Sequence, residues 1–170
     1  NVSVKIPAGV ETGNRMQLSG QGEVGAGGGP AGDLYVEMIV EEHEYLLRDG
    51  DNLHIAVSVP MTSAALGSEM NIETLDGEIN IEIKPGTQSG DVIAVKGKGM
   101  TKLRGGGRGD LYAHVSVEVP SKLSKKESDL LKEFAKLRSE DKSSNKMKSN
   151  KEDGQGSSGF FGRFKEAFRN

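Results

Sequence analysis

Gly32-Asp33-Leu34-Tyr35 recurs as Gly109-Asp110-Leu111-Tyr112, and this repetition decides how the fold is interpreted. Self-similarity at one fixed spacing is typical of a structural unit that occurs twice. The sequence therefore predicts two tandem copies of one fold. The same offset of 77 residues joins four more glycine pairs without a gap: Gly9 with Gly86, Gly13 with Gly90, Gly20 with Gly97, and Gly22 with Gly99.

Apolar positions follow the same offset, so the character of the residues repeats as well as their spacing. The second copy contains a front half, residues 43–77, that has no counterpart in the first copy. We therefore expect residues 1–41 to be the second half of one β domain, truncated at its N-terminus, and 42–120 to be a complete second one. The matched pairs are Val4 with Ile81, Ile6 with Ile83, Met16 with Ile93, Leu18 with Val95, and Val40 with Val117.

The strand pattern favours a small antiparallel β-sandwich in each copy. Residues 2–6 alternate with the period of a half-buried strand, and residues 15–19 form a second. The next run, residues 34–39, is apolar enough to be partly buried on both faces. Asp76-Gly77 indicates a hairpin turn between residues 70–75 and 78–83, since this dipeptide suits turns with positive φ. A short helical turn is expected at 61–67.

Composition supports a mainly β protein and excludes several functions. The 170 residues include 24 Gly, no Trp and no Cys, which suits short strands joined by turns and rules out disulfides and thiolate metal sites. The net charge is −3 and the basic residues form no stripe, so nucleic acid is not an expected partner. No apolar run is long enough to span a membrane, and no stable membrane insertion is expected.

The C-terminal part changes character after Pro120. Ser124 and Glu127 form a capping-box pattern, which predicts a helix within residues 121–138. Residues 139–159 are polar and expected to be a disordered linker. Residues 160–170 are expected to form a short amphipathic helix with an aromatic face, whose role is open between docking on its own domain, binding a partner and touching a membrane. The apolar side chains of the first helix are Leu130, Leu131, Phe134 and Leu137, and those of the tail are Phe160, Phe161, Phe164, Ala167 and Phe168.

The sequence gives little support for a nucleotide-binding, adhesion, catalytic or metal-binding motif. The three glycines within residues 20–25 resemble a dinucleotide loop, but Gly-rich sequence follows where a helix is required. The tripeptide at 108–110 keeps only Gly-Asp in the first copy, which indicates a strand entry and not an adhesion motif. Asp33 and Asp110 repeat between the copies and are expected to cap turns. The histidines, expected to be surface residues without metal-ligand spacing, are His43, His54 and His114.

Apolar strand surface in the first copy remains to be explained. Alternation assigns about half of these side chains to a plain sandwich core. The other half would line a groove in which an extended apolar segment adds as a strand, with main-chain hydrogen bonds giving affinity and pockets accepting side chains. The candidate binding residues are Val2, Val4, Ile6, Leu34, Val36 and Met38.

Residues 1 to about 138 resemble the C-terminal region of the DnaJ co-chaperone family in family order, and Gly159-Phe160-Phe161 resembles the aromatic tail of many bacterial members. The match is specific because many motifs occur together. They are Val4-Lys5-Ile6-Pro7-Ala8-Gly9-Val10, Gly20-Gln21-Gly22-Glu23, Gly29-Pro30-Ala31-Gly32-Asp33-Leu34-Tyr35-Val36, Leu47-Arg48-Asp49-Gly50-Asp51-Asn52-Leu53, Leu75-Asp76-Gly77, Pro85-Gly86-Thr87-Gln88 and Gly97-Lys98-Gly99-Met100.

The resemblance implies a cytoplasmic chaperone region without enzymatic activity. It implies that the first β domain binds unfolded clients, with Val2 and Val36 at groove positions, and that the full-length protein delivers them to a DnaK-type ATPase chaperone. It also implies a homodimer formed through the helix that carries Leu130, Leu131, Phe134 and Leu137. No cofactor is expected in this fragment, because the family's zinc-binding insertion would lie upstream.

Two alternatives stay open at this point. A structural or assembly β-sandwich would use the Gly-rich loops as spacers and the helix as its oligomer contact. A carbohydrate-binding β-sandwich needs exposed aromatic platforms, and only Tyr35, Tyr45 and Tyr112 are available.

Overall fold

The computed structural model describes residues 2–141, except the side chain of Ala26. It divides into two compact units, Asn1–Ser121 and Lys122–Asn170. The expected amphipathic tail at 160–170, and the expected linker at 139–159 beyond residue 141, lie outside the described residues.

The 77-residue repeat is confirmed by the backbone hydrogen bonds. Gly13 N donates to Met38 O, and its counterpart Gly90 N donates to Val115 O. Gly22 N donates to Gly32 O, as Gly99 N does to Gly109 O. The paired glycines also share their conformation: φ is 71° and 69° at Gly20 and Gly97, and 89° and 95° at Gly13 and Gly90. The matched turns of the two copies therefore share one backbone geometry.

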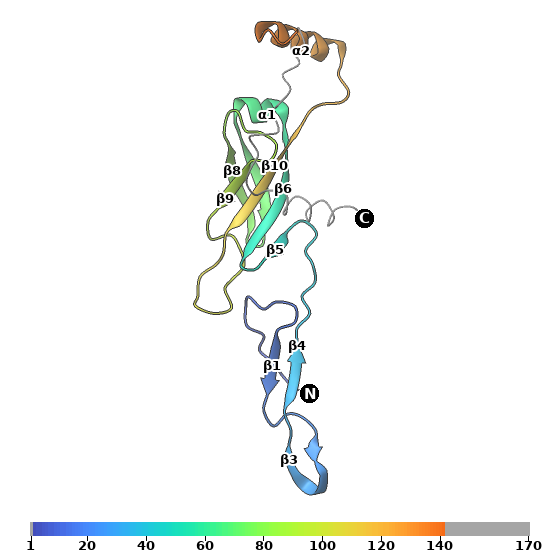
Figure 1. The fold of residues 1–170 in the computed structure, drawn as a ribbon, viewed down its shortest axis with the longest axis vertical. Coiled ribbons are helices and arrows are strands. Elements are labelled where there is room, and N and C mark those ends of the chain that lie inside the picture. Colours follow the sequence, from blue (N-terminus) through green and yellow to red (C-terminus); the bar gives the residue numbers. More distant parts are fainter. Residues whose placement is uncertain (1, 142–170) are drawn as a thin grey trace, which may run out of the picture. The chain divides into compact units, whose positions relative to one another are not determined.

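The first copy consists of two small two-stranded sheets. Strand β1 (Arg15–Leu18) pairs antiparallel with β4 (Leu34–Glu37), and the two lie side by side in Figure 1. Strands β2 (Val24–Gly25) and β3 (Gly29–Ala31) form a second ladder, joined by the 3-10 turn η1 (Ala26–Gly28).

The second copy contains a four-stranded sheet in the order β5-β6-β10-β9. The strands are β5 (Leu47–Asp49), β6 (Asn52–Pro60), β9 (Val92–Val95) and β10 (Leu111–Glu118). The expectation of a purely antiparallel sandwich is wrong in one respect, because β10 runs parallel to β6. Parallel neighbours need a long crossover, which the chain provides between Pro60 and Leu111. Turn dipeptides indicate hairpins between neighbouring strands, so they do not reveal the parallel pairing of β6 with β10.

The crossover contains the predicted hairpin and helical turn. Strands β7 (Ser68–Thr74) and β8 (Gly77–Ile83) pair antiparallel around the Asp76-Gly77 turn, where Gly77 has a φ of 98°. Helix α1 (Met61–Leu66) follows β6 directly and lies against the ends of β6 and β10 (Figure 1).

The core lies between the four-stranded sheet and the β7–β8 hairpin, which confirms a β-sandwich. Every second residue of β6 and β10 is buried on one face, as expected for a sheet with one face in the core. The hairpin contributes isoleucines to the same cluster, and α1 contributes Ala64. The sheet and hairpin residues include Ile55, Val57, Val59, Leu111, Ala113, Val115, Ile72, Ile81 and Ile83.

Two local expectations in the first copy are wrong. Residues 2–6 lie in no strand, because none of the described strands pairs with them and an unpaired strand leaves its backbone groups to water. Strand β4 is not buried on both faces. Leu34 and Val36 are half-buried, whereas Tyr35 is 62% exposed and Ile39, just beyond the strand, is 82% exposed. The two-stranded sheet has one covered face.

Helix α2 (Lys125–Leu137) confirms the predicted capping box in the second unit. Glu127 N donates to Ser124 Oγ at 3.3 Å, and Ser124 N donates to Glu127 Oε2 at 2.6 Å. Hydrogen bonding to the Ser124 side chain, and then to the Ser124 backbone N–H, lowers the pKa of the Glu127 carboxyl. The helix therefore begins where the sequence predicts.

Candidate functional site

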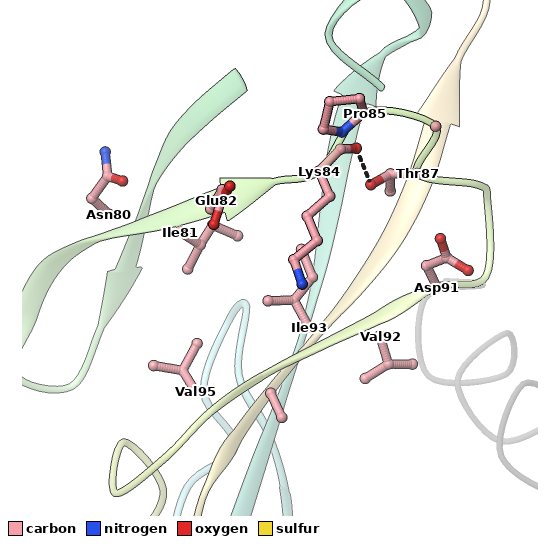
Figure 2. Close-up of a pocket in the computed structure, with 12 residues that line it drawn as sticks. Asn80, Ile81, Glu82, Lys84, Pro85, Thr87, Asp91, Val92, Ile93 and Val95 are labelled. Atoms are coloured by element: carbon pink, nitrogen blue, oxygen red, sulfur yellow. Dashed lines mark hydrogen bonds between the residues drawn. The ribbon is translucent and has the colours of Figure 1, made fainter. Parts of the chain in front are cut away.

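A groove in the second copy lies between two strands that each have an open edge. Strand β9 is the last strand of its sheet, and β8 pairs only with β7 among the described strands. The groove has a volume of about 690 Å³, and Figure 2 shows side chains from both strands lining it. Its lining residues are Asn80, Ile81, Glu82, Lys84, Pro85, Gly86, Thr87, Asp91, Val92, Ile93, Ala94 and Val95.

The lining combines an apolar part with charged residues. Ile81 is buried, and Ile93 and Val95 are partly buried against the core, so they present apolar surface between the strands. Glu82 and Lys84 are exposed and provide both signs of charge. An unpaired strand edge offers main-chain donors and acceptors, and neighbouring apolar pockets accept alternate side chains of an added strand. This arrangement suits an extended polypeptide.

One end of the groove is held by an arginine. Arg108 donates to both carboxylate oxygens of Asp76, at 2.8 and 2.7 Å, and to Gly99 O. Lys98 lies 3.5 Å from the same carboxylate. The hydrogen bond from Arg108 is the main reason why the pKa of Asp76 is lowered. These contacts join the β7–β8 turn to the loop after β9. Arg108 of the Arg-Gly-Asp tripeptide is thus engaged within the fold.

The other end of the groove is fixed by turn contacts. Gly86 N donates to Ala64 O at 2.8 Å, and Thr87 Oγ1 donates to Lys84 O at 2.7 Å (Figure 2). Gln88 N donates to Asp91 Oδ2 at 2.8 Å. The path from β8 to β9 is therefore set before any ligand arrives, which lowers the ordering cost of binding.

The repeat relates this groove to the first copy. Val4 and Ile6 correspond to Ile81 and Ile83 of β8, and Met16 and Leu18 of β1 correspond to Ile93 and Val95 of β9. The second copy forms both walls as strands, whereas the first copy forms only the β1 wall as a strand. The groove therefore has two strand walls in the second copy, and the matching place in the first copy has only one.

The predicted binding residues of the first copy fall into two groups. Leu34 and Val36 lie opposite Leu18 and Met16 on the β4–β1 ladder, and Met38 is buried just beyond β4. The structure thus brings these three together on the covered side of the small sheet. The other three lie on the segment outside any strand: Val2 is 46% exposed, Ile6 is 57% exposed, and Val4 is half-buried.

Sequence reasoning missed the groove of the second copy. Its apolar members, Ile81, Ile93 and Val95, were already paired by the offset with Val4, Met16 and Leu18. The repeat was therefore the signal that pointed to them.

Two histidines are not surface residues, which corrects the expectation from sequence. His54 and His114 are 9% and 8% exposed, and His54 Nδ1 lies 2.9 Å from His114 Nε2. Their positions on adjacent strands, 60 residues apart in sequence, are set by the parallel β6–β10 pairing. Burial is the main reason why the pKa of each imidazole is lowered. His43 is exposed as expected.

The repeated aspartates cap turns, as predicted. Asp33 Oδ1 accepts a hydrogen bond from Gly20 N at 3.0 Å, and Asp110 Oδ1 accepts one from Gly97 N at 2.8 Å. Asp33 also accepts a hydrogen bond from the amide of Gln17, which is the main cause of its lowered pKa.

The apolar residues of α2 form an exposed stripe. No residue of this helix is buried; Leu130 and Phe134 are 57% and 54% exposed, Leu137 is 81% exposed, and Leu131 is half-buried. Their spacing along the helix places the four on one side.

Within residues 2–141, no group of three or more His, Cys, Asp or Glu side chains is arranged to hold a metal ion. No helix in this described part is long and apolar enough to cross a membrane.

The fold defines a tandem β-repeat protein followed by a helix, and comparison with known proteins gives its family. The DnaJ C terminal domain model matches residues 1–120. Chaperone protein DnaJ 2 of Streptomyces avermitilis and that of Streptomyces coelicolor are each 52% identical over 167 residues, covering 98% of this chain and 43% of the relative. Chaperone protein DnaJ 1 of Mycolicibacterium paratuberculosis is 55% identical over 141 residues, covering 82% of this chain and 37% of the relative.

The chain belongs to the DnaJ family and is a C-terminal region of a DnaJ-type chaperone. It spans less than half the length of these curated relatives.

Proposed function

We propose that this region binds unfolded polypeptide by adding an extended segment to an open strand edge. The observation that carries the proposal is the groove between β8 and β9: within residues 2–141 each of these strands has one edge without a strand partner, and the lining between them is partly apolar. The main chain of a client supplies hydrogen bonds that do not depend on its sequence, while Ile81, Ile93 and Val95 favour apolar side chains. Such a site tolerates many clients.

The proposal includes the first copy as a second client position. Among the described strands β1 pairs only with β4, so its other edge is open as that of β9 is. The residues predicted to bind there are Val2, Val4, Ile6, Leu34, Val36 and Met38. Two sites on one chain raise the effective concentration of one client segment once another is bound.

The proposal extends to assembly and delivery. The exposed stripe of Leu130, Leu131, Phe134 and Leu137 would pair with the same stripe of a second chain to form a homodimer. In the full-length protein, clients would pass to a DnaK-type ATPase chaperone in the cytoplasm. The region itself would hold clients without catalysing a reaction, and any zinc would belong to an upstream part.

Binding of a fluorescent, extended apolar peptide to the full chain tests the groove. Ile93→Asn is the test variant and Ile79→Asn the matched control, because both isoleucines are partly buried against the core but only Ile93 lines the groove. We expect the Kd to rise at least about tenfold for Ile93→Asn alone, in line with losing one apolar pocket contact of about 1.4 kcal/mol or more. Circular dichroism checks that both variants fold.

Equal binding by the two variants would contradict a site between β8 and β9. Absence of binding by the unaltered chain would favour the structural or assembly module. Tight binding of a soluble oligosaccharide in place of the peptide would favour the carbohydrate-binding alternative.

A further inference from the structure

Arg108 binds both walls of the groove at the end where β8 begins and β9 finishes. Its Nη1 donates to the two carboxylate oxygens of Asp76 at 2.8 and 2.7 Å. Its Nε and Nη2 donate to Gly99 O at 2.9 and 2.7 Å. Asp76 lies in the β7–β8 turn, whereas Gly99 follows β9. One guanidinium therefore connects the hairpin layer of the sandwich with the sheet layer.

The two partners of Arg108 are themselves held in place. On the hairpin side, Asp76 N donates to Thr74 Oγ1 at 3.2 Å, and the same hydroxyl donates to Gly77 O at 2.7 Å. On the sheet side, Gly99 N donates to Gly109 O at 2.8 Å. The guanidinium is a planar group with donors in fixed directions. Because neither partner is free to follow it, Arg108 fixes the separation between them.

The separation of β8 and β9 is limited in different ways at the two ends of the groove. At one end the chain itself joins the strands, through the turn at residues 84–91. At the other end β8 begins at Gly77 and β9 finishes at Val95, so only non-covalent contacts hold the two strands together. A gap of about 0.5–1 Å already forfeits about a quarter to a half of a contact energy. Binding of an added strand therefore depends on this separation.

The repeat provides an internal comparison for Arg108. The offset of 77 residues places Ala31 at its position in the first copy, followed by the same Gly-Asp pair. Asp33 and Asp110 cap equivalent turns, so the strand entry forms in both copies and does not require the arginine. What the second copy has in addition is a groove with two strand walls. The arginine thus occurs in the copy that forms both walls.

We propose that Arg108 is a positioning residue that holds β8 at the separation from β9 required by an added strand. This rests on the proposed function, because the separation matters for binding only if a polypeptide lies between the strands. Arg108 is not one of the lining residues, and it acts through Asp76 and Gly99. Without it, the turn end of the β7–β8 hairpin moves away from β9, while the buried isoleucines keep the sandwich folded.

Distances between pairs of spin labels in the full chain test the positioning without any ligand. The native sequence has no Cys, so labels attach only at designed positions. Glu78→Cys with Lys96→Cys reports on the end near Arg108, and Glu82→Cys with Val92→Cys reports on the turn end; all four positions are exposed. We expect Arg108→Met to lengthen and broaden the distance in the first pair and to leave the second pair unchanged. General loosening of the fold would change both.

Two further variants show which contact is responsible. Arg104→Met is the matched control, because Arg104 is exposed on the same loop and makes no side-chain hydrogen bond or ion pair with any residue in the range 2–141. Asp76→Asn removes the carboxylate and keeps the turn, since Asn-Gly suits the same turn as Asp-Gly. It should lengthen the first distance as Arg108→Met does. The double variant should go no further than either single one, as expected for two groups that act through one contact.

Binding of the fluorescent apolar peptide connects the separation with affinity. We expect the Kd to rise at least about tenfold for Arg108→Met and for Asp76→Asn, and to stay unchanged for Arg104→Met. An unchanged first distance in Arg108→Met, equal changes in both label pairs, or an unchanged Kd despite a longer distance would each overturn the proposal. If the unaltered chain binds no peptide, the proposed function fails, and the distances still decide whether Arg108 sets the position of β8.

Discussion

Arg48 Nη1 donates a hydrogen bond to the main-chain oxygen of Val10 at 2.6 Å, which joins β5 of the second copy to the first turn of the first copy. The same guanidinium reaches Gly9 O at 2.8 Å and Glu11 Oε1 at 3.1 Å, and its Nε donates to Gly50 O. The Arg48 side chain is only 19% exposed. One planar group with five donors therefore connects the two copies.

Replacing this arginine by lysine should weaken the connection although the charge is kept. Lysine is a point charge and cannot reproduce a planar fork that serves several carbonyls at once. We expect Arg48→Lys to lower the free energy of unfolding by about 1.5–3 kcal/mol, the range for hydrogen bonds to a charged group. The measurement is urea unfolding monitored by circular dichroism.

The matched control is Arg15→Lys. Arg15 pairs with Glu37 on the exposed surface of the β1–β4 ladder, and such pairs contribute about 0–1 kcal/mol. Equal losses for the two variants would show that the contacts of Arg48 do not join the copies energetically.

A pair of equivalent glycines offers a second comparison. Gly9 and Gly86 have φ of 90° and 86°, so an alanine at either position pays the same conformational cost of about 1–2 kcal/mol. Only at Gly9 would the new methyl clash with backbone, against Thr101 O and Leu103 N; nothing lies within 4 Å at Gly86.

We therefore expect Gly9→Ala to destabilise the chain by at least about 1 kcal/mol more than Gly86→Ala, because a clash with backbone adds to the shared strain. Thermal unfolding of both variants under identical conditions checks this. Losses of the same size would mean that the first turn does not pack against residues 101–103.

Acid should destabilise the second copy through its buried histidines. The pKa values of His54 and His114 are lowered in the folded chain, mainly by burial. The negative charge of Asp49 partly opposes the lowering of the His54 pKa, whereas a positive charge on His54 lowers the pKa of His114 further. The ring of Tyr112 stacks on that of His54. The unfolded chain thus binds more protons, so this stability is present above a pH of about 6.5 and is lost as the pH falls.

Tm measured at pH 7.5 and 5.5 tests this expectation. His114→Gln should reduce the drop in Tm between the two pH values, whereas His43→Gln, at an exposed position, should leave the drop unchanged. The account fails if His114→Gln leaves the pH dependence as it is in the unaltered chain.

Loss of the α2 stripe should abolish the proposed dimer. Burial of a Phe and a Leu side chain contributes about 1.5–3 kcal/mol each, so the double variant Phe134→Asp, Leu137→Asp should raise the dimer Kd by at least about a hundredfold. Analytical ultracentrifugation measures the mass. Lys132→Asp, on the opposite side of α2, is the control and should remain dimeric. A double variant with unchanged mass would contradict an interface on this stripe.

Much of the fold follows from local sequence signals. The offset of 77 residues predicted that the two copies contain equivalent turns. Gly13 and Gly90 confirm this, because each donates its backbone N–H to a carbonyl at the matching position of its own copy. The Asp76-Gly77 turn and the Ser124–Glu127 capping box were predictable because each depends on neighbouring residues alone.

Features that depend on distant residues were not predictable in the same way. The parallel β6–β10 pairing joins residues more than 50 positions apart, and the burial of His54 beside His114 follows from it. The alternation of Val2, Val4 and Ile6 predicted a strand, but a strand also needs a partner, which periodicity cannot supply. The candidate groove between β8 and β9 was not predicted, because the sequence analysis placed the binding surface in the first copy; the repeat paired its apolar positions with residues of the first copy but did not indicate which copy forms both walls.

Hydrogen exchange of the full chain with and without an unfolded client tests the central proposal most directly. An added strand protects the amides of the edge to which it pairs, and β5, the opposite edge of the same sheet as β9, is an internal control. The account predicts that a saturating client slows exchange in β8 and β9, and in β1 of the first copy, but not in β5. Protection confined to β5 or α2 while the client stays bound would contradict it.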